Sequence, residues 1–297
     1  MLLDAILEDD MAHITELLKE GANVDARDRH TGQPAIMLAR SREVMSLLMN
    51  TGANLKATDD KGRSVIACTS WYDLLPEDTD VNQQDEEGNT PLMHAITWYD
   101  KDKIDWLLAH GANIHLRNHD GYSCLDISIS HGFTGLTQLL IDAGAVITCP
   151  EAAAMNSVSW LDRCLEEGLS IDAKNASGET ALFVATQFGY RKLAEYLILN
   201  EADVNLADCN GTTPLMEACG RSCHDMALLL IEAGADIHAR NNEGWTALMA
   251  ASYAGMSDMV KRLLQCGAER EMVDRYGMTA EKYALQQNHY EIARMLS

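Results

Sequence analysis

The chain has 297 residues, with 23 Lys and Arg against 45 Asp and Glu, which gives a formal net charge of −22 with neutral His. Nucleic-acid backbones and anionic membrane surfaces both attract clustered Lys and Arg, so this excess of acid argues against either partner. Hydrophobic residues make up 47% of the chain, enough for a real core, and only 5 Pro leave little room for a disordered linker. The composition therefore predicts continuous folded material.

The first ten residues, MLLDAILEDD, differ from a secretory signal, which begins with positive charge followed by an unbroken apolar run. No window of the sequence approaches the roughly 20 apolar residues that cross a bilayer. The 8 Cys residues show no paired C-x-x-C spacing, which favours free thiols in a reducing compartment. We therefore expect a soluble, cytoplasmic protein.

One phrase recurs along the chain, at intervals of 33 residues over most of its length. GNTPLMHA begins at Gly88, GETALFVA at Gly178, GTTPLMEA at Gly211 and GWTALMAA at Gly244. A second phrase follows each time, as in HGANIH and AGADIH, with an apolar pair just before it. We interpret each unit as a turn, two antiparallel helices and a hairpin.

Residue types at fixed places in the unit support this interpretation. The turn glycine supplies a positive φ, and the Thr two residues later can cap the first helix, with Pro91 and Pro214 at its first position. A small Ala in that helix allows close approach of its neighbours. The expected caps are Thr90, Thr180, Thr213, Thr246 and Thr279, and the expected small residues are Ala95, Ala185, Ala218 and Ala251.

These phrases resemble the ankyrin repeat, whose signature is TPLHxAA followed by LLxxGADVN at a 33-residue period. The resemblance covers essentially the whole chain and implies an all-α fold, a solenoid of stacked helix-turn-helix units with hairpin fingers. Met93, Met216 and Met249 stand where the family usually has His. We therefore expect altered local hydrogen bonding and an unchanged fold.

The units are unequal, and we count about ten, including a partial cap at each end. After the cap at residues 1–28, the unit at 29–58 has its two glycines, Gly32 and Gly52, 20 positions apart rather than 23, so a helix or the turn between helices is shortened. The unit at 59–84 leaves barely one turn for a second helix. Near full-length units begin at Asp85, Asn118, Asn175, Asp208 and Asn241.

The unit between Thr148 and Lys174 has no D-x-x-G turn. Pro150 is expected to start a helix directly, over EAAAMNSVS, followed by a second helix over WLDRCLEEG. The hairpin finger should be missing or reduced there. We therefore divide the predicted array into residues 1–147 and residues 148–297, within one continuous solenoid.

The resemblance implies an extended concave face that binds other proteins. Aromatic residues and Arg are concentrated at positions facing it, although aromatics make up only 6% of the chain. Trp, Tyr and Arg commonly carry interface hot spots, and the alternative is that each ring covers a neighbouring unit. The expected partner-binding residues at these positions are Trp71, Tyr72, Trp98, Tyr122, His131, Phe188, Arg221, Trp245, Tyr253 and Tyr276.

A run of acidic residues without any Lys or Arg follows Trp71 and Tyr72, and we name residues 73–87 the acidic segment. Together with the neighbouring aromatic residues, the acidic segment predicts a docking site for a basic protein segment, since complementary charge raises the association rate. The alternative is an ordinary solvated loop. The acidic residues of the segment are Asp73, Glu77, Asp78, Asp80, Asp85, Glu86 and Glu87.

No arrangement of residues indicates catalysis, a cofactor, a metal or a small-molecule substrate. His115 and His119 flank a predicted finger rather than share one helix face. Cys219 occupies a small-residue slot in a helix, which favours a buried structural thiol although Cys223 and His224 lie nearby in sequence. The chain has no phosphate-binding Gly-rich loop and no nucleophile elbow.

We therefore predict a non-enzymatic protein-protein interaction module that binds a protein with a basic surface through its concave face. An inhibitor or immunity-type antitoxin of a basic toxin is one form of this function. An effector or scaffold that engages signalling or host proteins is the alternative, because a repeat scaffold does not specify its partner. A metal-dependent enzyme or regulator using the His or Cys groups is a remote alternative.

Overall fold

The computed structural model of the chain describes residues 1–297, and its regular elements are all helical, as the sequence predicted. The helices pair into ten successive units. On a larger scale the chain divides into two compact parts, Met1–Ala145 and Val146–Ser297, which we name unit 1 and unit 2. A single helix pair is instead counted in words, so that the third unit is the pair of α4 (Val65–Cys68) and η2 (Tyr72–Leu74). That unit 1 and unit 2 form one continuous solenoid stays a prediction.

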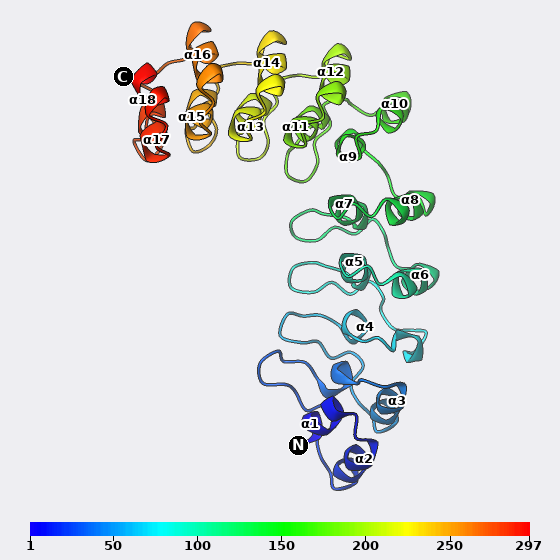
Figure 1. Cartoon of the computed structure of the whole chain (residues 1–297). Coiled ribbons are helices and arrows are strands. Elements are labelled where there is room, and N and C mark those ends of the chain that lie inside the picture. The colour runs from blue at the N-terminus through cyan, green and yellow to red at the C-terminus, as the bar shows by residue number, and fades with distance from the viewer. The chain divides into compact units, whose positions relative to one another are not determined.

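Unit 1 contains two rows of helices, with the finger loops projecting beside the row formed by α4, α5 and α7 (Figure 1). Its elements are α1 (Leu2–Glu8), α2 (Met11–Lys19), the 3₁₀ helix η1 (Ala35–Leu38), α3 (Arg42–Asn50), α4 (Val65–Cys68), the 3₁₀ helix η2 (Tyr72–Leu74), α5 (Pro91–Thr97), α6 (Lys101–Ala109), α7 (Cys124–Ser130) and α8 (Thr134–Asp142).

Unit 2 repeats the same two-row arrangement, and none of its helices is as short as α4 (Figure 1). Its elements are α9 (Cys149–Ala154), α10 (Val158–Glu166), α11 (Ala181–Gln187), α12 (Arg191–Leu199), α13 (Pro214–Gly220), α14 (His224–Glu232), α15 (Ala247–Tyr253), α16 (Ser257–Gln265), α17 (Ala280–Gln286) and α18 (Tyr290–Leu296). None of the helices in either unit is both long and apolar enough to cross a membrane.

The predicted helix caps are present. Each of the five Thr side chains accepts a hydrogen bond from the backbone N–H three residues later, as Thr90 does from Met93 at 3.2 Å. The four Ala residues of the first helices are fully buried, which lets neighbouring helices approach closely. The repeat phrase thus fixes both where the first helix starts and how tightly it packs.

Methionine replaces histidine inside the units without changing the helices. Met93 is 1% exposed, and its Sδ accepts the backbone N–H of Thr90 at 3.4 Å. Met216 and Met249 are buried at the same place in their helices. The local hydrogen bonding is therefore altered while the fold is kept, as expected.

The finger turns stack closely, which explains why their glycines recur. Gly88 has a φ of 80°, in the region that favours glycine. A Cβ on Gly88 would lie 2.7 Å from the backbone nitrogen of His119 in the next finger. In the fingers themselves, the His119 N–H donates to the Glu87 carbonyl at 2.9 Å, so adjacent fingers are joined by their backbones.

The second and third units are shortened, as the sequence predicted. In the second, η1 stands in place of the first helix while α3 keeps its full 9 residues. In the third, α4 has 4 residues and η2 only 3, so the second helix is reduced to a single turn. The third unit therefore lacks most of the layer that covers its neighbours elsewhere.

A buried lysine from the following unit compensates for part of this loss. Lys103, on α6, is 3% exposed, and its Nζ donates to the carbonyl oxygens of Ala67 at 3.0 Å and Thr69 at 2.9 Å. These carbonyls lie at the end of the short helix α4, where no further helical turn supplies N–H groups to donate to them. The Nζ also lies 5.6 Å from the centre of the Tyr72 ring, within cation–π range.

The predicted helix bounds in the fingerless unit were wrong. We expected the first helix over residues 151–159, but α9 begins at Cys149 and ends at Ala154. Asn156 adopts the left-handed conformation with φ 51°, which interrupts the helix. Ser157 then caps α10 by accepting the Trp160 N–H at 3.3 Å, so the second helix starts at Val158 rather than at Trp160.

Burial lowers the pKa of Lys103 from 10.5 to about 8. Between these values the unfolded chain keeps a proton that the folded chain has released, so raising the pH favours the folded state. We predict that wild type gains about 1–3 kcal/mol of unfolding free energy over Lys103→Met between pH 8 and pH 10.5. Urea unfolding of both proteins, followed by Trp fluorescence, measures this difference.

Groups common to wild type and variant cancel in that comparison, including the buried thiols, whose ionisation opposes folding at high pH. A difference in unfolding free energy that stays constant over this pH range would contradict the assignment of a buried, partly deprotonated Lys103.

Candidate functional site

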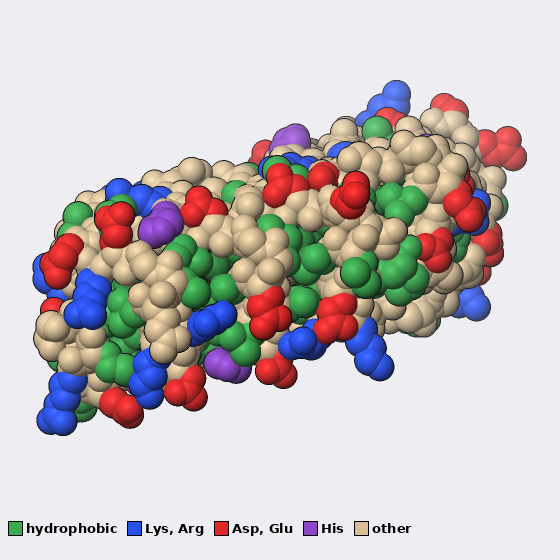
Figure 2. Space-filling view, turned by 90° about the horizontal axis from the view of Figure 1, so that it is seen from above, with side chains coloured by type: hydrophobic (Ala, Val, Ile, Leu, Met, Phe, Trp, Pro, Cys, Tyr) green, Lys and Arg blue, Asp and Glu red, His purple; other side chains and the backbone are tan.

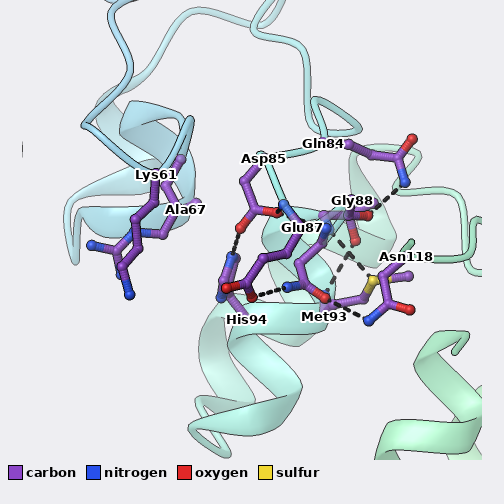
Figure 3. Close-up of polar contacts among 12 residues, drawn as sticks. Lys61, Ala67, Gln84, Asp85, Glu87, Gly88, Met93, His94 and Asn118 are labelled. Atoms are coloured by element: carbon purple, nitrogen blue, oxygen red, sulfur yellow. Dashed lines mark hydrogen bonds and ion pairs between the residues drawn. The ribbon is translucent and has the colours of Figure 1, made fainter. Parts of the chain in front are cut away.

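The most exposed tryptophan of the predicted row is Trp98, at the C-terminal end of α5. Its side chain is 55% exposed, and its ring stacks on His94 with centroids 5.4 Å apart and planes 23° apart. His94 lies one helical turn earlier and donates from Nε2 to Asp85 Oδ2 at 2.7 Å. Figure 3 shows the Asp85 carboxylate bonded to the His94 imidazole, so the finger turn holds the ring on which Trp98 stacks.

Asp85 serves the finger turn itself. The side chain is 4% exposed, and its Oδ1 accepts the N–H groups of Glu87 at 3.0 Å and Asn89 at 2.8 Å. Both carboxylate oxygens are thus used inside the protein, one by the turn and one by His94. Asp85 stands in the predicted set as a partner-binding residue, and the structure buries its side chain in the turn, bonded to His94.

A chain of polar side chains joins this finger to the next (Figure 3). Asn89 Nδ2 donates to Glu87 Oε2 at 3.2 Å, and Asn118 Nδ2 donates to Asn89 Oδ1 at 3.0 Å. Glu87 remains exposed in this arrangement. We name the surface formed by Glu86, Glu87, His94 and Trp98 the Trp98 surface.

The remaining acidic residues of the segment divide into two groups. Asp73 forms an ion pair with Arg42 at 2.7 Å, and Asp80 Oδ1 accepts the N–H of Asn82 at 2.9 Å. Glu77, Asp78 and Glu86 are exposed and form no ion pair. Part of the segment therefore keeps its charge available to a partner, and part is used within the protein.

Trp71 and Tyr72 lie in the shortened unit and are only partly exposed. The Tyr72 ring packs on Trp106 of α6 with centroids 5.4 Å apart, and the Trp71 indole nitrogen is buried without a hydrogen-bond partner. The rings of Tyr72 and Trp106 pack over the gap left by the missing helix. Of the two predicted tryptophans in this part of the chain, Trp71 and Trp98, only Trp98 presents most of its side chain to solvent.

The next unit adds further rings. His131 and Tyr122 are exposed, Tyr122 at 41%. Phe133 stacks on His131 with centroids 5.3 Å apart and contacts Tyr99 at 4.6 Å. Sequence reasoning missed Tyr99 and Phe133, although Tyr99 directly follows Trp98 and Phe133 lies two residues after His131.

In unit 2 the predicted rings differ in their surroundings. Trp245 packs against Tyr283 at 4.6 Å and Tyr253 at 5.8 Å between ring centroids, so Trp245 covers a neighbouring helix, while Tyr253 is 43% exposed. Phe188 is 53% exposed and Tyr276 is 66% exposed. Arg221 pairs with Glu217 on its own helix.

The groups considered for metal binding do not converge. No cluster of three or more His, Cys, Asp or Glu side chains that could hold a metal ion exists in residues 1–297. His115 and His119 are exposed on a finger. Cys219 is fully buried, and this burial raises the pKa of its thiol to about 12, as befits a packing residue. All eight cysteines are free thiols, as expected.

The net acidity is unevenly spread along the chain. Unit 1 carries 24 Asp and Glu against 11 Lys and Arg, and unit 2 carries 21 against 12. On the face shown in Figure 2, acidic, basic and apolar side chains are interspersed. By contrast, no Lys or Arg occurs between Arg63 and Lys101, a stretch that holds 8 acidic residues.

Comparison with known proteins supports the repeat assignment. The family model of ankyrin repeats, in three copies, matches residues 65–150, 151–241 and 233–297. The potassium channel AKT2/3 of Arabidopsis thaliana is 30% identical over 163 residues, 52% of this chain and 20% of the channel. A putative ankyrin repeat protein of Acanthamoeba polyphaga mimivirus is 24% identical over 214 residues, 67% of this chain and 25% of that protein.

The B-cell lymphoma 3 protein homolog of Mus musculus is 30% identical over 144 residues, 43% of this chain and 32% of that protein. The matched region thus spans a fifth to a third of the length of these relatives. The ankyrin repeat is a protein-protein interaction module and generally non-enzymatic. The family model matches well over half of the chain, and the chain belongs to the ankyrin repeat family.

Proposed function

We propose that this chain binds a basic segment of another protein through the Trp98 surface of unit 1. The observation that carries the proposal is an indole ring that is 55% exposed yet held in place by His94 and Asp85. A ring already held in one orientation loses less conformational entropy on binding than a free one. Such a ring suits an interface anchor.

The charge of unit 1 supports a basic partner. Glu86 and Glu87 are exposed in the finger, and the sequence has no Lys or Arg between Arg63 and Lys101. The exposed Lys61 of the preceding finger is the nearby cation, since its carbonyl accepts the Glu86 N–H at 3.0 Å. A Lys or Arg of the partner can lie on the Trp98 face, where cation–π attraction is strongest for an indole. The surrounding negative field also raises the association rate.

The proposed mode of binding leaves two biological forms. Occlusion of a functional basic surface would make the chain an inhibitor, as an immunity-type antitoxin of a basic toxin is. Binding away from such a surface would make it a scaffold or effector. An activity assay of the purified partner, with and without this chain, distinguishes them.

We predict that Trp98→Ala weakens the complex at least about 30-fold, the loss typical of a hot spot, without changing the urea midpoint. Phe188→Ala is the matched control, because Phe188 occupies the same helix-end position in unit 2 and is 53% exposed. The partner is captured from the source organism, purified, and titrated by calorimetry. Equal affinity of Trp98→Ala and wild type, with loss in Phe188→Ala, would move the site to unit 2.

Charge reversal is not needed to test steering. Neutralisation by Glu86→Gln and Glu87→Gln together should slow association several-fold at low salt and flatten its salt dependence. Glu166→Gln with Glu232→Gln removes the same charge from exposed positions in unit 2 and should leave the rate nearly unchanged. Stopped-flow measurements at several salt concentrations provide the comparison, and equal effects of both pairs would refute a local role for the finger acids.

A further inference from the structure

A cleft of about 540 Å³ lies in unit 1 beside the shortened third unit. Ser64 and Ile66, at the start of α4, line one part of it, and Pro76, Asp78 and Asp80 of the acidic segment line another. None of these residues belongs to the Trp98 surface. A volume of roughly 300–1,000 Å³ is typical of ligand sites in proteins.

The same position in a regular unit is almost closed. In unit 2 the groove lined by Thr246, Leu248, Ala268 and Glu269 holds about 40 Å³. Ser64 and Thr246 each follow their turn glycine by two residues, and Asp80 and Glu269 each precede the next turn's Asp by five. The two sites are therefore equivalent, and the one in the third unit has the larger volume.

The missing second helix explains the difference. In the regular unit, α16 ends just before Gly267, and Ala268, 8% exposed, closes the groove. In the third unit only η2 precedes Pro76, and Asp78 and Thr79 stand at the places of Gly267 and Ala268. A loop with a carboxylate thus replaces a compact helix end.

A buried hydroxyl at the cleft has no partner within the protein. Ser64 is 6% exposed, and its Oγ makes no hydrogen bond. At the equivalent position, Thr246 Oγ1 accepts the N–H of Met249 at 3.3 Å and caps α15. Leaving a buried hydroxyl unpaired is unfavourable, so such a group is expected to have a ligand or another role.

We propose that this cleft receives an arginine side chain of the partner protein, a proposal that rests on the binding function argued above. Asp78 is exposed without an ion pair, and Asp80 accepts the Asn82 N–H at Oδ1 and likewise forms no ion pair. The planar guanidinium offers five N–H donors to these carboxylates and to the Ser64 hydroxyl. Ile66 and Pro76 offer apolar contact to the aliphatic stem.

Lys56 also lines the cleft and is the one basic side chain there. It is exposed, and its side chain makes no ion pair with either Asp. With two carboxylates against one ammonium, the lining keeps a net negative charge. The cleft is larger than one side chain requires, so the residues that flank the arginine enter with it.

The test uses the full chain labelled with ¹⁵N and the probe N-acetyl-L-arginine N-methylamide. Its citrulline analogue, in which a neutral urea replaces the guanidinium, is the matched control. We expect saturable chemical-shift changes of the backbone amides of residues 64–66 and 78–83 with the arginine probe, and none with the citrulline analogue. Asp78→Asn with Asp80→Asn should weaken this binding about tenfold, since charge-assisted hydrogen bonds are lost.

Absence of saturable shifts, equal shifts with the citrulline analogue, or similar shifts around Thr246 and Glu269 would each overturn the proposal. Ser64→Ala provides a second variant: it should weaken probe binding while leaving the urea midpoint unchanged, because this hydroxyl caps nothing. Thr246→Ala should lower the midpoint, since it removes a cap.

Partner titrations separate this inference from the proposed function. Loss of partner binding in Trp98→Ala, with no effect of Asp78→Asn and Asp80→Asn on either partner or probe, removes the cleft inference alone. If Trp98→Ala leaves partner binding unchanged while the arginine probe still shifts the amides of the cleft residues, the Trp98 surface is refuted and the arginine site is kept.

Discussion

Within each of the two units, a repeat buries its apolar side chains against neighbouring repeats, so a helix lost from one repeat uncovers groups in the next. The third unit shows how such a loss is compensated. Lys103 from the following unit reaches the last carbonyls of α4, and the rings of Tyr72 and Trp106 pack together over the gap. The compensation is incomplete, and the cleft beside Ser64 is what remains open.

The regular features could be predicted from the sequence because each has a local cause. Turn glycines need a positive φ, and the Thr caps bond to an N–H only three residues away. The bounds of α9 were missed although the repeat carried a signal for them. Asn156 lies 33 residues before Gly189, which has a φ of 71°, and Asn tolerates the left-handed conformation that ends a helix.

The candidate site was only partly predictable, because position in a repeat does not reveal what a side chain contacts. Trp98 and Trp245 both stood in the predicted row, yet Trp98 is exposed on His94, while Trp245 packs against Tyr283 of the next unit. The sequence alone did not distinguish Asp85 from the exposed acidic residues around it, but its position at the start of the turn places its side chain inside the finger, where it accepts the Asn89 N–H.

Lys103 carried a readable signal that the sequence analysis did not use. It occupies the position held by Leu136, Leu193, Met226 and Met259 in other units, where an apolar side chain is buried. A lysine at such a position indicates nearby acceptor groups that lack a donor, and the spacing of the sequence already showed that the neighbouring unit is short. The two observations together could have placed its partners.

The central claim is that unit 1, and not unit 2, binds the partner protein. Hydrogen exchange of the chain, free and bound to its purified partner, measures this directly because each finger and helix end reports separately. The account predicts that added protection on binding concentrates between residues 60 and 133, around the finger of Glu86 and the end of α5. Protection concentrated between residues 180 and 290 instead would contradict it.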